Sequence, residues 1–79
     1  MPRFYFHLRN DVIADDEEGQ ELPDLAAARE VAIMNARELA AATVLEGRLH
    51  LGHYIEIENE HGQIVATVTF REAVTIEAY

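Results

Sequence analysis

Serine, cysteine, lysine and tryptophan are all absent from this chain of 79 residues. Without serine, cysteine or lysine, the chain lacks the side chains that most often attack a substrate covalently. A phosphate-binding loop of the Walker type is excluded as well, because it requires a lysine. These absences disfavour an enzyme, so we expect no catalytic residues and no cofactor.

Long apolar runs and disulfides are also missing. No apolar run approaches the roughly 20 residues that a membrane-spanning helix needs. The first residues, Met1–His7, show no pattern of a secretory signal. Small secreted domains often carry disulfides, which this chain cannot form. We therefore expect a bacterial cytoplasmic protein that does not bind a membrane.

The charge is strongly one-sided, with 15 acidic residues against 6 arginines and a net charge of -9. Nucleic-acid binders usually gain affinity from a basic patch that neutralises phosphates, and six scattered arginines give no such patch, so we expect no nucleic-acid partner. Anionic membrane surfaces are disfavoured for the same electrostatic reason. The charge remains compatible with a basic protein partner, which an acidic surface would attract.

Apolar and polar residues alternate over about residues 3–9, which is the period of a half-buried strand. Turn residues follow, and a second short strand is expected over about residues 12–15. The strongest charge run, residues 15–21, is interpreted as a solvated loop. In the first strand, Phe4, Phe6 and Leu8 are expected to face the core, and Arg3, Tyr5, His7 and Arg9 to face outward.

A long helix is expected over about residues 25–45. Asp24 can cap it, because its carboxylate accepts hydrogen bonds from free backbone N–H groups of the first turn. Gly47 can supply the left-handed turn after the C-terminus. The apolar stripe expected to face a sheet contains Leu25, Ala28, Ala32, Ala36, Leu39 and Thr43.

Further apolar residues of this helix lie away from that stripe. Single exposed apolar residues are normal, but a lone helix on a sheet does not need several of them. Either the C-terminal segment or a second subunit would cover them. We expect a homodimer, through this helix face or through an edge strand, and place the candidate dimer surface at Ile33, Met34, Val44 and Leu45.

Two more strands are expected over about residues 54–58 and 63–70, joined by a turn at Gly62. Residues 71–79 form a C-terminal tail that can begin with a helical turn. The whole chain is thus expected to be one α+β domain, a two-layer β-β-α-β-β sandwich. Its mainly antiparallel four-stranded sheet carries one long helix on one face. The inward residues of the last two strands are Ile55, Ile57, Ile64, Ala66, Val68 and Phe70.

Several motifs resemble a family of small uncharacterised proteins from rhizobia and related alphaproteobacteria, a domain of unknown function. The resemblance covers nearly the whole chain and implies no activity. Its motifs are Pro2–Leu8, Asp16–Gly19, Glu21–Arg29, Ala36–Leu39, Ile57–Gly62 and Thr67–Val74.

The first half is also similar to the HicB-type antitoxins. Those proteins open with an aromatic strand, pass through an acidic turn that contains glycine and a Pro-Asp step, and enter a helix rich in alanine and glutamate. This similarity implies a small basic toxin as a partner. The chain shows no recognisable appended DNA-binding helix-turn-helix or ribbon.

His50 and His53 have an H-x-x-H spacing, with Glu56 or His61 available as a third ligand. Imidazole and carboxylate ligands suit zinc. The segment is irregular, however, so no helix holds both rings on one face, and the HExxH pattern is absent. We interpret both histidines as surface residues and assign no metal ligands. The alternative is a small metal-dependent enzyme that uses these histidines and nearby acids.

The acidic run between Asp11 and Asp24 carries enough oxygen atoms to bind Ca²⁺ or Mg²⁺. Its spacing differs from that of a calcium loop, because Ile13 and Asp16 occupy positions that need an Asp or Asn and a glycine. A solvated loop before a helix explains the run without a cation.

The outward face of the expected sheet is the best candidate for a partner surface. His7 would need a neighbouring carboxylate, such as Glu56 or Glu58, to act as an acid or base. The simpler interpretation is a partly exposed histidine paired across strands. We therefore expect a non-enzymatic interaction or regulatory module whose partner surface contains Tyr5, His7, Arg9, Tyr54, Thr67 and Thr69.

Overall fold

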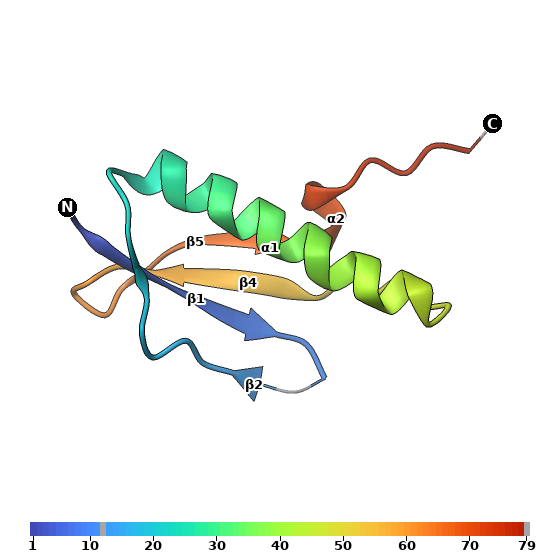
Figure 1. The fold of residues 1–79 in the computed structure, drawn as a ribbon, viewed down its shortest axis with the longest axis horizontal. Coiled ribbons are helices and arrows are strands. Elements are labelled where there is room, and N and C mark those ends of the chain that lie inside the picture. Colours follow the sequence, from blue (N-terminus) through green and yellow to red (C-terminus); the bar gives the residue numbers. More distant parts are fainter. Residues whose placement is uncertain (12, 79) are drawn as a thin grey trace.

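The computed structural model describes residues 1–11 and 13–78. It confirms an α+β fold with one long helix over a mainly antiparallel sheet (Figure 1). The predicted strand at about residues 12–15 includes Val12, and the predicted tail includes Tyr79; both residues lie outside the described part. In chain order the elements are β1 (Arg3–Arg9), β2 (Ile13–Ala14), β3 (Gln20–Glu21), α1 (Leu25–Leu45), β4 (Tyr54–Glu58), β5 (Ile64–Thr69) and α2 (Phe70–Ala73).

The sheet has five strands instead of the four predicted. Its order is β2-β1-β4-β5, and β3 pairs with β1 as well, with antiparallel pairing throughout. The added strand comes from the end of the predicted solvated loop. Arg3 pairs with Glu21, and the N–H of Leu22 donates to the carbonyl of Pro2 at 3.0 Å. Backbone pairing therefore holds the end of the acidic run against β1.

The strand register separates two faces. On the inner face, Phe6 lies beside Ile57 on β4, and Leu8 lies beside Ile55. On β5 the register shifts by one residue, so that Glu58 is opposite Ile64. Because cross-strand partners share a face, Ile64 lies on the outer face and is 48% exposed. Its predicted inward orientation is wrong, since a bulge interrupts the alternation.

Helix α1 lies over β4 and β5 (Figure 1), and the side chains that it buries are alanines. The carboxylate of Asp24 caps the helix by accepting from the N–H of Ala27 at 2.9 Å. Small side chains let the helix axis approach the sheet closely. Leu25, predicted in the stripe, is instead exposed, because it lies in the first turn. The residues of α1 that are buried are Ala28, Ala32, Ala36 and Ala40.

The short helix α2 directly follows β5 and contributes two residues to the core. It is capped by Thr69 and Glu72, each of which accepts from the other's backbone N–H. Phe70 and Ala73 are buried, and the guanidinium Nε of Arg37 on α1 donates to the carbonyl of Ala73 at 2.7 Å. No helix in the described part of the chain has the length and apolarity to cross a membrane.

Candidate functional site

His7 lies on the outer face of the sheet but is only 7% exposed. Its Nε2 atom is 2.7 Å from Oε1 of Glu58, and its Nδ1 atom accepts from the backbone N–H of Asp16 at 3.1 Å. The expected pairing across strands is therefore present, but the expected partial exposure is wrong. The loop between β2 and β3 crosses this part of the face and brings the Asp16 backbone to the ring, which sequence alternation does not reveal.

Asp16 holds that loop in place. Its carboxylate accepts from the backbone N–H groups of Phe6 at 3.1 Å, Glu18 at 3.1 Å and Gly19 at 3.0 Å. Burial alone would raise the pKa of Asp16, but these hydrogen bonds together lower it below the ordinary value. β1 pairs with β3 near its start and with β2 near its end. Asp16 acts as a cap between these two pairings, because its carboxylate accepts from the N–H of Phe6.

Arg9 links two carboxylates on the same face. Its guanidinium lies 2.8 Å from Oδ1 of Asp15 and 2.7 Å from Oε1 of Glu56. The hydrogen bond to Asp15 is the largest cause of a raised pKa for Arg9, and Glu56 adds to it. The same contact with Arg9 lowers the pKa of Asp15. The single guanidinium offsets only one of the two negative charges, so the group of three stays negative.

Several titratable groups of the outer face pair with one another. Within the described residues, every buried side-chain nitrogen and oxygen has a hydrogen-bond partner. A general base must reach a substrate proton through a nitrogen or oxygen that is available to it. In His7 one ring nitrogen is occupied by a backbone N–H and the other by Glu58. Neither ring nitrogen of His7 is therefore free in this arrangement, which links β1 to β4 and to the loop between β2 and β3.

The six residues of the predicted partner surface do share this face. The register places Tyr54 opposite Arg9 and Thr69, and places Thr67 opposite Glu56. Thr67 is exposed and Tyr54 is half-buried, whereas His7 is buried. Their use by a partner stays a prediction.

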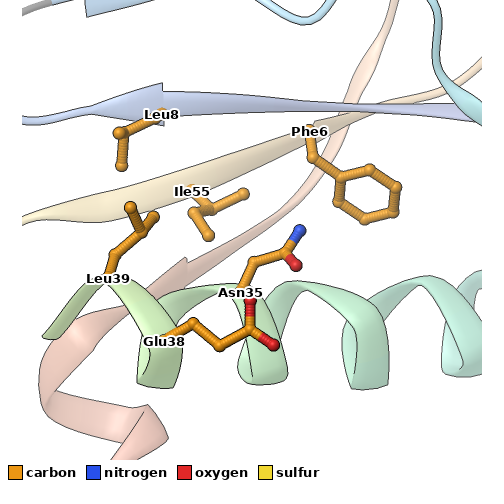
Figure 2. Close-up of a pocket in the computed structure, with 6 residues that line it drawn as sticks. All are labelled: Phe6, Leu8, Asn35, Glu38, Leu39 and Ile55. Atoms are coloured by element: carbon orange, nitrogen blue, oxygen red, sulfur yellow. The ribbon is translucent and has the colours of Figure 1, made fainter. Parts of the chain in front are cut away.

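An open groove lies on the inner face, between α1 and β1. It has a volume of about 300 Å³. A helix is only about 10 Å wide, whereas strands lie about 4.8 Å apart. One helix over β4 and β5 therefore leaves the inner side of β1 partly uncovered. Figure 2 shows the groove residues, which are Phe6 and Leu8 from β1, Ile55 from β4, and Asn35, Glu38 and Leu39 from α1.

Sequence reasoning missed this groove. Phe6, Leu8 and Leu39 were predicted to be core residues, but they are only partly buried beside the core. The comparison of helix width with sheet width was available from the sequence and would have indicated an uncovered strip. The largest fully buried side chains are instead Ile55 and Ile57 on β4, Val68 on β5, and Phe70 at the start of α2.

Three of the four residues of the predicted dimer surface, Met34, Val44 and Leu45, are exposed on α1. Leu45 is 90% exposed, and Val44 and Met34 are about half exposed. The fourth, Ile33, is half-buried, packs against the core, and lines a hollow with Met34. Self-association through these residues stays a prediction.

His50 and His53 come together with a residue that the sequence analysis did not assign to them. Their rings stack with centroids 4.5 Å apart, and Nε2 of His53 is 3.8 Å from Oδ1 of Asp11. The suggested third ligands lie elsewhere: Glu56 pairs with Arg9, and His61 lies beside its neighbour Glu60. Asp11 was missed because it comes from a different loop, more than 35 residues away in the chain.

The model of a family described as a domain of unknown function, DUF6894, matches residues 3–71. The chain belongs to this family. The part that matches DUF6894 includes all five strands and α1, and it ends within α2. No curated protein and no solved structure matches the chain. The family description names no activity, so function has to be argued from the geometry.

Proposed function

We propose that this domain is a non-enzymatic protein-interaction module. Its groove between α1 and β1 holds an apolar segment of a partner protein that also carries positive charge. The observation that supports this proposal is the open strip of the inner face, with the groove beside it. By contrast, His7 and Arg9 on the outer face already pair with carboxylates of this chain.

The walls of the groove fit apolar side chains. Phe6, Leu8 and Ile55 form one wall, and Leu39 projects from the helix toward them (Figure 2). Burying one side chain of the size of leucine contributes about 1.5–3 kcal/mol. The uncovered strip lies beside α1, where a second helix would complete the layer. An amphipathic helix, packing its apolar face into the groove, is therefore the segment that fits best.

The charge of the chain selects a basic partner. Glu38 lies at the rim of the groove, and the whole chain carries a net charge of -9. An acidic rim attracts lysine or arginine side chains that flank the apolar face of a partner helix, and it repels acidic segments. Complementary charge also speeds the encounter of the two proteins.

An antitoxin-like role is a narrower version of this proposal. In that case the basic partner is a small toxin, as the similarity of the first half to HicB-type antitoxins implies. A gene for a small basic protein beside the gene for this chain would support that version. A neighbourhood without such a gene would leave the general proposal of a basic partner.

The test uses a synthetic helical peptide of about 18 residues, with leucines on one face and lysines on the other. A peptide of identical composition but scrambled order measures non-specific attraction to the acidic surface. We expect micromolar binding of the amphipathic peptide, measured by calorimetry, and at least about tenfold weaker binding of the scrambled one.

Two variants localise the binding. Asn35→Gln combined with Glu38→Lys fills and recharges the rim without removing a core residue, and we expect it to weaken binding about tenfold or more. Glu30→Lys makes a similar charge change on the other flank of α1 and serves as the matched control. Equal losses in both variants would show that only net charge matters and would contradict the proposal.

A further inference from the structure

Two loops that are distant in the sequence meet at one end of the sheet. Arg9 pairs with Tyr54, so the residues that follow β1 lie beside the residues that precede β4. Asp11 comes from the first loop, and His50 and His53 come from the second. Their candidate ligand atoms all lie within 4.8 Å of one another.

We propose that Asp11, His50 and His53 bind one divalent transition-metal ion, with Zn²⁺ as the ion that the ligand set suits best. Two imidazole nitrogens and one carboxylate oxygen are the donors that zinc takes in sites with three protein ligands. A water molecule would complete a tetrahedral arrangement. This inference is independent of the groove, and it rests on no assumed reaction.

His53 is the fixed member of the triad. Its ring packs edge-on against the buried Phe70, with centroids 5.6 Å apart, and its carbonyl accepts from the N–H of Phe70 at 2.8 Å. His50 is held one turn earlier, because its carbonyl accepts from the N–H of His53 at 3.4 Å. The core therefore positions one imidazole and restricts the second.

The remaining movement is small. Zinc–nitrogen bonds of about 2.0–2.1 Å in a tetrahedron place neighbouring ligand atoms about 3.3 Å apart. The spread of up to 4.8 Å therefore has to contract by about 1.5 Å. Side-chain rotation can supply this contraction, because Asp11 is exposed.

The electrostatic setting favours a cation. A chain of net charge -9 raises the local concentration of divalent ions. Binding would join the β1–β2 loop to the α1–β4 loop. An ion that binds the folded chain and not the unfolded chain stabilises the fold. Zinc is thus expected to link the two loops and to stabilise the folded chain.

The test is a titration of the tag-free protein with ZnCl₂, followed by calorimetry and by the ¹⁵N resonances of the histidine rings. We expect one ion per chain, a higher midpoint of thermal unfolding, and shifts at His50 and His53. Removing one ligand should weaken binding about tenfold or more. The variants are His50→Ala and Asp11→Asn; the latter lies on an exposed residue and should fold normally.

His61→Ala is the matched control, because His61 is an exposed histidine beside a glutamate but outside the triad. We expect it to bind zinc as the wild type does. An absence of stoichiometric binding at submillimolar zinc would overturn the proposal. So would zinc binding that depends on His61, or that survives both ligand variants unchanged, because these results indicate adventitious binding only.

Discussion

The Nε2 atom of His7 on β1 lies 2.7 Å from the Oε1 atom of Glu58 on β4, under a loop that leaves the histidine 7% exposed. Because Nδ1 of His7 accepts from a backbone N–H of the loop, the ring carries its proton on Nε2 and donates it to Glu58. The pair thus joins two central strands and the loop in one chain of hydrogen bonds.

Substituting Glu58 tests how much the hydrogen bond between His7 and Glu58 stabilises the fold. We expect Glu58→Ala to lower the free energy of unfolding by about 1–3 kcal/mol, because His7 keeps a buried donor without an acceptor. Glu58→Gln retains an acceptor oxygen and should cost less. Urea denaturation near neutral pH measures both. Equal costs for the two variants would show that the hydrogen bond contributes nothing.

The cap formed by Asp16 predicts a dependence of stability on pH. Folding lowers the pKa of this carboxyl below its unfolded value of about 3.9. Its contribution to stability is therefore fully present above that value and is lost as pH falls through the folded pKa. Asp15, whose pKa is lowered by Arg9, acts in the same direction.

Asp16→Ala should therefore destabilise the protein by about 1–3 kcal/mol near neutral pH, because backbone N–H groups lose their acceptor. The variant should also lose less stability than the wild type between about pH 5 and pH 2. Urea denaturation series across this range measure both effects. A wild-type and a variant curve that stay parallel would contradict the assigned role of Asp16.

Gly19 lies in the loop between β2 and β3, where the backbone leaves no room for a side chain. Its φ is +68°, and a Cβ there would lie 2.8 Å from the carbonyl oxygen of Phe4 and 2.9 Å from the ring of Tyr5. A left-handed conformation alone costs a residue with a side chain about 1–2 kcal/mol. We expect Gly19→Ala to cost more than Gly47→Ala, which has positive φ but open space, when thermal unfolding is compared. The reverse order would be inconsistent with this loop geometry.

The centre of the core and the groove should respond differently to truncation. Ile57 is 0% exposed, so Ile57→Ala should cost about 2–5 kcal/mol. Leu39 lines the open groove, so its truncation leaves no closed cavity. Leu39→Ala should therefore lower the free energy of unfolding by less than Ile57→Ala does. Denaturant unfolding of both variants decides this point. A larger cost at Leu39 would mean that the groove is closed in solution.

Local patterns predicted most of the fold. The alternation of period two from Arg3 to Arg9 and from Tyr54 to Glu58, and the capped helical stripe between them, reflect interactions among neighbouring residues. Events that depend on distant residues were missed. The bulge that turns Ile64 outward and the pairing of Gln20 and Glu21 with β1 are set by the partner strand.

The candidate sites were less predictable for the same reason. The H-x-x-H spacing indicated His50 and His53, but their third neighbour, Asp11, is brought there by the pairing of β1 with β4. His7 was expected to be partly exposed, because no sequence pattern shows that the loop between β2 and β3 folds over β1. The groove is different: it exists because one helix is narrower than the sheet, and the predicted elements already implied that mismatch of widths.

Self-association through α1 is a separate expectation. We predict a homodimer at micromolar concentration, because Met34, Val44 and Leu45 are exposed on the helix. Sedimentation of the wild type beside a Met34→Glu, Val44→Glu double variant tests this. A dimer that persists in the variant would move the interface to the sheet, and a monomeric wild type would refute the expectation.

The most direct test of the proposed function is chemical-shift mapping of ¹⁵N-labelled protein titrated with the amphipathic leucine–lysine peptide. We predict that the largest shifts fall on the groove residues Phe6, Leu8, Asn35, Leu39 and Ile55. Shifts confined to the acidic loop at residues 15–21, or to Tyr54, Thr67 and Thr69 on the outer face, would contradict the assignment of the groove as the binding site.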